Sequence, residues 1–510
     1  MPTILQDYHE LLIKFRQSTI LQSALEILNW DMETMMPPKG VKLRSEQLAE
    51  LTGIVHRLVT DPEIGQRLDR IDNQSATQSL SQVQKRNIYL LRKSYEENSS
   101  LPRELVVETE RQRALTINVW KKAKATKNYP LFRPELEKLV TLTKQAAEIL
   151  RDVKQTSTLY DALIDIYEPK VTSSMITQIF DQMRKGLITL IEKCVTAKKQ
   201  PDITFLSRQV PIPTQILIAN ALAETINYDI RSEEARGRID ETEHPFTTGY
   251  YDDVRITTHY YPHDFSSSIF SVLHEGGHAL YEQNLPADWM YQPIGSSCSL
   301  GFHESQSRFV ENIIGRSREF WDYFYPILRQ LTKQTFSDIS LDQFVFAINH
   351  VKPSKIRVAA DEVTYGLHII IRFEIERELM QNRITVGELP IVWNQKYRDY
   401  LDLDIENDSE GVMQDTHWAG GTIGYFPTYA LGNIYSGQIL VALECELPHW
   451  RSQIQRGDNN QVKDWLINQI FSYGNLYDPT EFMKQITGKA ITVTPYLEYL
   501  NDKYSQLYDF

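Results

Sequence analysis

The chain has 510 residues, of which 42% are hydrophobic, and it carries a net charge of −13 at pH 7. This content allows a large buried core, and the acidic balance argues against nucleic acid as the main partner. Three cysteines, Cys194, Cys298 and Cys445, are too few and too scattered for a disulfide framework or a thiolate metal cage, which fits a reducing compartment.

The N-terminal sequence MPTILQDYHELLIKF has an early acidic residue and no basic region before an unbroken apolar run, so it predicts no signal peptide. No apolar stretch approaches the roughly 18 residues of a membrane-spanning helix. We therefore expect a cytoplasmic protein that does not insert into membranes.

Helical periodicity dominates the chain. Between residues 8 and 33, apolar side chains recur at helical spacing: Leu11, Leu12, Phe15, Ile20, Leu21, Leu25 and Leu28. Similar patterns occur in the segments 80–125, 134–152, 173–194 and 340–381. Breaks come at Pro37 and Pro38, at Pro102, and in the polar stretch 197–201.

The segment 247–258, TTGYYDDVRITT, is instead rich in β-branched and aromatic residues and predicts a short pair of strands. There is no fixed-period repeat, low-complexity tract or charged tail. The sequence therefore predicts one large, mainly helical unit over residues 1–510.

The sequence HEGGH at positions 274–278 raises the question of a metal site. Residues four apart lie on one face of a helix, about 6 Å apart along its axis, so His274 and His278 can each direct a nitrogen at one ion. Glu275 is rotated about 100° away, near the ion without binding it. That position suits a base that acts on water at the metal.

The simpler interpretation is a pair of histidines that cap or pack on one helix. By chance, the full His-Glu-x-x-His pattern would arise in only about one or two in a hundred chains with this histidine content, so a metal site is the better hypothesis. Gly276 and Gly277 count slightly against a helix, because each costs up to about 1 kcal/mol in a helix interior. Their presence indicates close backbone packing there, for example beside a substrate.

A catalytic zinc site needs three protein ligands and one open position. The downstream sequence GFHESQSRFVEN supplies Glu304, which shares one face of the expected helix with Arg308 and Glu311. A solvated surface acid is the ordinary alternative for any glutamate, and His303 and Glu311 are rival ligands. Spacing alone leaves the third ligand open.

Five motifs occur in order along the chain: DVRIT (253–257), HEGGH (274–278), HESQS (303–307), IRVAAD (356–361) and GVMQDTHW (411–418). The stretch NWDMETMMPPKG (29–40) precedes them. In this order they resemble the carboxypeptidase Taq family, zinc-dependent metallocarboxypeptidases with a mainly helical, gluzincin-like fold. The likeness extends over essentially the whole chain.

The resemblance implies that His274, His278 and Glu304 bind the metal and that Glu275 is the general base. The metal would be one Zn²⁺ per chain, with Co²⁺ or another divalent ion as the alternative, because nitrogen and oxygen ligands discriminate weakly. The resemblance also implies a homodimer and a long substrate groove, which we expect the N-terminal helices (about 1–200) to cover. The implied activity releases single C-terminal residues from peptides, with broad side-chain tolerance and proline poorly accepted.

A carboxypeptidase must distinguish the end of a peptide from its middle, and the end differs by one carboxylate. Arginine suits this group because its planar guanidinium forms two parallel charge-assisted hydrogen bonds. Although most arginines are solvated surface charges, we expect Arg357 of IRVAAD to bind the carboxylate and Arg255 of DVRIT to close the end of the groove. Asp253 and Asp361 would orient these arginines or form structural salt bridges, and Gln414 would bind substrate backbone.

Peptide hydrolysis also needs hydrogen-bond donors for the developing oxyanion. His417 and Tyr425 are the candidates and Tyr429 is a rival, although core packing explains a single tyrosine equally well. Ligating histidines usually donate their second N–H to a carboxylate or carbonyl. Glu311 and Asp361 are both open candidates for that partner.

Two other functions compete with a carboxypeptidase. A zinc oligopeptidase would keep the metal and cut internal bonds of short peptides, but the arginines of DVRIT and IRVAAD favour the chain end. A non-catalytic helical scaffold would hold at most a structural metal. Structural zinc prefers four closed ligands, often thiolates, and here a glutamate follows His274 where a base is needed.

Overall fold

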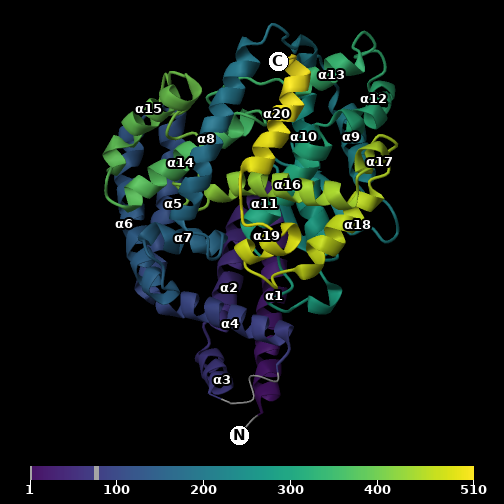
Figure 1. Cartoon of the computed structure of the whole chain (residues 1–510). Helices are drawn as coiled ribbons and strands as arrows, with labels where there is room; N and C mark the ends of the chain where they lie inside the picture. The colour runs from purple at the N-terminus through teal and green to yellow at the C-terminus, as the bar shows by residue number, and fades with distance from the viewer. Residues whose placement is uncertain (1–2, 74–79) are drawn as a thin grey trace.

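Helices make up most of the protein, as its apolar spacing predicts (Figure 1). The computed structural model describes residues 3–73 and 80–510. The helices before the sheet are α1 (Ile4–Thr34), α2 (Val41–Val59), α3 (Pro62–Asp72), α4 (Gln82–Ser100), α5 (Arg103–Ala125), α6 (Tyr129–Lys154), α7 (Leu159–Tyr167), α8 (Ser173–Thr196) and α9 (Ile212–Thr225). Within these described ranges, no helix is both long and apolar enough to cross a bilayer.

The helices after the sheet carry most of the candidate site. They are α10 (Phe265–Gln283), α11 (Leu300–Arg308), α12 (Arg318–Thr332), α13 (Leu341–Ile348), α14 (Tyr365–Met380), α15 (Leu389–Leu401), α16 (Pro427–Glu446), α17 (Trp450–Ile454), α18 (Asn460–Gln469), α19 (Pro479–Thr487) and α20 (Thr494–Tyr508). A π-helical turn, Phe309–Ile314, continues α11 and carries Glu311. HEGGH therefore lies on α10 and HESQS on α11, and these two helices pack against each other.

A small sheet precedes α10 and has the strand order β1-β3-β2. β2 (Thr247–Tyr250) and β3 (Asp253–Thr258) form the antiparallel pair that the sequence predicts for this segment. β1 (Gly237–Glu241) adds to the other edge of β3 in parallel and places Arg238 beside Arg255. The sequence did not reveal β1, because GRIDE is short and mostly polar and becomes a strand only through its pairing with β3.

One continuous hydrophobic core extends from Ala123 in α5 to Tyr508 in α20. A smaller cluster joins α1, α3 and α4 through Ile4, Tyr8, Leu11, Ile64, Leu68, Ile71, Leu80, Ile88 and Leu91. Figure 1 shows these first helices gathered at the end of the molecule opposite the C-terminus. Single-unit organisation, with residues 1–200 over the groove, stays a prediction.

Two glycines allow the helices of the candidate site to approach closely. A Cβ atom on Gly277 of α10 would lie 2.5 Å from the carbonyl oxygen of Gln306 in α11. A Cβ atom on Gly432 of α16 would lie 2.5 Å from Cγ of Glu304, also in α11. Contacts this short exclude any side chain, so α11 is held between α10 and α16. The close backbone packing expected at the HEGGH glycines is confirmed for Gly277, whose neighbour is a helix, whereas Gly276 meets the side chain of Ile226.

Candidate active site

Three side chains converge between α10 and α11. Nε2 of His274 lies 3.6 Å from Oε2 of Glu304, and Nε2 of His278 lies 3.3 Å from the same oxygen. The three ligand atoms lie within 4.8 Å of one another. Among residues 3–73 and 80–510, no other group of three histidine, cysteine or acidic side chains is so arranged.

The donor set fits a divalent ion such as zinc. Bonds of about 2.0–2.1 Å at tetrahedral angles would separate neighbouring ligand atoms by roughly 3.4 Å, close to the observed distances. The outward atoms of two ligands are already bound, because Nδ1 of His274 lies 2.8 Å from Oε2 of Glu311 and Oε1 of Glu304 accepts from Nε of Arg308 at 2.7 Å. Nε2 of His274 and Oε2 of Glu304 therefore face His278 and the space for an ion.

His303 lies behind His278 rather than among the candidate ligands. Its Nδ1 is 2.6 Å from Nδ1 of His278, and its Nε2 is 2.7 Å from Oε1 of Glu282. This chain of contacts orients the ring of His278, as partners of metal-binding histidines commonly do. Of the two carboxylates left open by the sequence, Glu311 contacts a candidate ligand and Asp361 contacts neither histidine.

Glu275 points towards the sheet, where the Thr247 hydroxyl of β2 donates to its Oε2 at 2.6 Å. Burial raises the pKa of the Glu275 carboxyl above its ordinary value, while His274 and Thr247 act in the opposite direction. A carboxylate of raised pKa beside the candidate ligands suits a proton acceptor. Thr247 was not a sequence candidate, because nothing in its strand shows that it passes Glu275.

Arg357 and Gln414 belong to a buried network centred on Asp415. Nε and Nη2 of Arg357 lie 3.1 and 2.8 Å from Oδ1 of Asp415, and Nε of Arg372 donates to Oδ2 at 2.7 Å. Burial acts to raise the pKa of Asp415, but the two guanidiniums hold it well below its usual range. The Gln414 amide oxygen accepts from the Arg357 backbone and from Arg372, so a contact with substrate stays a prediction.

The two aspartates expected to orient the arginines behave differently. Asp253 binds Arg255 through both oxygens, each at 2.7 Å, and the Arg255 guanidinium lies 4.2 Å from the ring centre of Trp30. Asp361 does not contact Arg357, and its carboxylate accepts backbone N–H groups at the start of α14. The expectation for Asp361 is therefore wrong, because the partner of Arg357 comes from GVMQDTHW.

His417, Tyr425 and Tyr429 form an aromatic group beside this network. Nε2 of His417 lies 3.2 Å from the Tyr429 hydroxyl, while Nδ1 is buried and has no partner in the described residues. Burial, then the charge of Arg357, lowers the pKa of His417 to about 4, so the ring is neutral at pH 7. Burial, then the charge of Glu304, raises the pKa of Tyr425 to about 12, which keeps its hydroxyl protonated.

Known proteins are similar to this chain in sequence and in overall fold. The model of the carboxypeptidase Taq (M32) metallopeptidase family matches residues 10–504. The chain belongs to this family. Thermostable carboxypeptidase 1 of Thermus thermophilus is 38% identical over 508 residues, which cover 98% of this chain and 99% of that protein. Carboxypeptidase 1 of Bacillus subtilis is 37% identical, with 95% of each chain covered.

A crystal structure of an M32 carboxypeptidase from Deinococcus radiodurans superposes with a TM-score of 0.94 at 33% identity, covering 99% of this chain and 100% of that chain. The resemblance carried by the five motifs is thus confirmed. As a member of the carboxypeptidase Taq family, the protein is a metallocarboxypeptidase.

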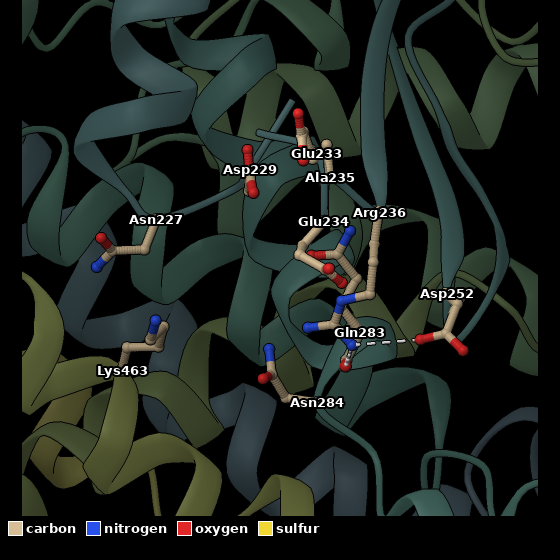
Figure 2. Close-up of a pocket in the computed structure, with 10 residues that line it drawn as sticks. All are labelled: Asn227, Asp229, Glu233, Glu234, Ala235, Arg236, Asp252, Gln283, Asn284 and Lys463. Atoms are coloured by element: carbon tan, nitrogen blue, oxygen red, sulfur yellow. Dashed lines mark hydrogen bonds and ion pairs between the residues drawn. The ribbon is translucent and has the colours of Figure 1, made fainter. Parts of the chain in front are cut away.

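A polar pocket of about 650 Å³ opens at the C-terminal end of α10 (Figure 2). Its lining residues are Asn227, Asp229, Glu233, Glu234, Ala235, Arg236, Asp252, Gln283, Asn284 and Lys463. Arg236 donates to the backbone carbonyl of Gln283 at 2.6 Å and lies 3.7 Å from Asp252. None of the candidate metal, base or substrate residues lines it, so we do not place the carboxypeptidase Taq chemistry there.

We expect Glu311→Gln to weaken metal binding by roughly 10-fold or more, because it removes the negative charge beside Nδ1 of His274. Competition with a coloured chelator would measure the affinity. Glu378→Gln is the control, since among the described residues the Glu378 carboxylate meets only the exposed Arg383, at 3.5 Å. Equal affinities for both variants would contradict the supporting role of Glu311.

Proposed function

We propose that the protein is a zinc-dependent carboxypeptidase that releases single residues from the free C-termini of peptides, with broad side-chain tolerance and proline poorly accepted. One connection carries the proposal. Arg357 donates to the Tyr365 hydroxyl at 3.2 Å, and Arg308, which binds Glu304, lies 4.3 Å from the ring centre of Tyr365. A single tyrosine thus links the candidate carboxylate site to the candidate metal ligands.

Glu275 is the proposed general base. A zinc ion on His274, His278 and Glu304 would supply a Lewis acid that activates water near neutral pH and polarises the attacked carbonyl. Glu275 accepts a proton from the attacking water and later passes it to the leaving amine. Thr247 holds Oε2 of Glu275, which leaves Oε1 for the water.

His417 and Tyr425 are the proposed donors to the oxyanion. We assign the single proton of the neutral His417 ring to Nδ1, so that Nε2 accepts from the Tyr429 hydroxyl 3.2 Å away. That N–H is buried and has no acceptor among the described residues, so no protein group competes for it. The protonated Tyr425 hydroxyl adds a second donor, and two fixed donors in a buried site stabilise developing charge better than water does.

Recognition of the chain end is assigned to Arg357. Asp415 holds Nε and one N–H of Nη2, which fixes the plane of the guanidinium and leaves donors on Nη1 and Nη2 for a carboxylate. Arg255, stacked on Trp30, is proposed to close the end of the groove.

The test uses one peptide in two forms, as the free acid and as the C-terminal amide, with zinc-loaded protein and a chelator control. Mass spectrometry should show a ladder of products that lose one residue at a time from the free acid alone, and the chelator should stop it. Internal fragments from both forms would instead support an oligopeptidase. No cleavage of either form would overturn the catalytic proposal.

We expect Arg357→Ala to lower kcat/KM on the free acid by roughly 100-fold, which corresponds to about 3 kcal/mol for a lost charged hydrogen-bonding partner. The amide should be affected little, so the preference for the acid should largely disappear. Arg372 still pairs with Asp415 in this variant, and the exposed Arg383→Ala is the control. If Arg255→Ala abolishes the preference and Arg357→Ala does not, the two arginine roles are reversed.

Two further properties are proposed, the first from family likeness and the second from the few, scattered cysteines. We expect a homodimer, which sedimentation velocity would measure, and a cytoplasmic location, which cell fractionation would measure. A monomer at micromolar concentration would contradict the first.

A further inference from the structure

The loop between α15 and α16 carries both proposed oxyanion donors. Its central turn is stabilised from within, because the Thr422 N–H and hydroxyl both donate hydrogen bonds to the His417 carbonyl, at 3.0 and 2.9 Å. The candidate metal ligands lie on other helices, α10 and α11. His417 and Tyr425 can serve the reaction only if the loop is fixed relative to those helices.

Glu376 of α14 binds this loop at two points. Its Oε1 accepts from the indole N–H of Trp418 at 2.8 Å, and its Oε2 accepts from the backbone N–H of Gly424 at 2.9 Å. Trp418 directly follows His417, and Gly424 directly precedes Tyr425. Each residue held by Glu376 is therefore the chain neighbour of one proposed donor.

Burial of the Glu376 carboxylate has a desolvation cost, which an apolar side chain filling the same space would not have. It is fully buried, and its partners among the described residues are three neutral donors, the third being the Tyr160 hydroxyl of α7 at 2.8 Å. Burial raises the pKa of Glu376 to about 7, and the hydrogen bonds from Gly424, Trp418 and Tyr160 act against that rise. An apolar side chain would avoid this desolvation cost but could not hold the loop.

We infer that Glu376 is a positioning residue, which ties both ends of the 417–425 turn to α14 and so aims His417 and Tyr425 at the oxyanion. The inference rests on the proposed function. Donors act only where charge develops, and a displacement of about 1 Å at such a site can cost on the order of 100-fold in rate.

The first experiment compares variants by steady-state kinetics, metal content and melting temperature. Glu376→Gln places an amide –NH₂ against one of its present donors, so we expect kcat to fall by roughly 10- to 100-fold with KM and bound metal unchanged. Trp418→Phe removes the indole donor while leaving the carboxylate, and should lower kcat by about 10-fold.

Glu362→Gln is the matched control. Glu362 is also a buried carboxylate, and it receives hydrogen bonds from Tyr499, Tyr504 and Lys503 of α20 without touching the loop. It should lower the melting temperature while leaving kcat unchanged. An equal loss of kcat in this control would show that general destabilisation, rather than loop position, explains the effect.

A double-mutant cycle separates positioning from a structural role. In a His417→Ala/Tyr425→Phe background, single-turnover rates should change by less than about twofold on adding Glu376→Gln, because the groups it positions are gone. The same fold-loss in both backgrounds, or wild-type kcat in both Glu376→Gln and Trp418→Phe, would overturn the inference. A wild-type rate for the background itself would overturn the oxyanion roles and the positioning with them.

Discussion

Glu275→Gln is expected to lower kcat by about 10²- to 10⁴-fold, the range that a lost general base or acid costs, while bound metal stays near normal. The amide keeps the shape of the side chain and its contact with Thr247 but cannot accept the proton. Metal content by atomic emission and turnover of a free-acid peptide measure the two halves of this result.

Glu234→Gln is the control, because it makes the same substitution at an exposed residue of the polar pocket, which none of the candidate ligands lines. It should keep both metal and activity. If Glu275→Gln lost its metal, the side chain would be a ligand. If it kept full activity, another residue would be the base.

Glu304→Ala is expected to weaken metal binding by more than the roughly 10- to 100-fold that loss of an outer partner costs, because it removes a direct ligand. Two histidines on one helix turn would remain, and turnover should fall to the level of the chelated wild type. Equilibrium dialysis against buffered zinc, followed by assay at saturating metal, measures both effects.

The same experiment on His303→Ala provides the comparison. His303 contacts His278 and Glu282 rather than the space for the ion, so its loss should resemble that of Glu311 in size. A larger loss of affinity for His303→Ala than for Glu304→Ala would reverse the ligand assignment.

Spacing alone could not choose the third ligand among Glu304, His303 and Glu311. The contacts that surround the candidate ligands explain why. Glu304, Arg308 and Glu311 do share one face. Arg308 binds both carboxylates of that face, Glu304 at 2.7 Å and Glu311 at 3.1 Å. The π-helical turn shifts Glu311 to Nδ1 of His274, away from the ion-facing nitrogens. The periodicity of an ordinary α-helix does not predict this change in the position of Glu311.

The local elements were determined by the sequence alone. Helix periodicity, the strand pair near 247–258 and the common face of His274 and His278 all follow from spacing within a few residues. The order of five motifs predicted the family. The helices, the strand pair and the shared histidine face have one physical cause, since backbone geometry sets which near neighbours lie on one face.

Only the tertiary structure decided which distant residues meet. It placed Glu304 rather than His303 opposite Nε2 of both His274 and His278, and Asp415 rather than Asp361 on Arg357. It also added Thr247 and Glu376, which no pattern marked. These contacts join residues far apart in the chain, and they depend on how closely helices pack. The distance between packed helices is set by the volumes of side chains throughout the core, and no local sequence periodicity encodes it.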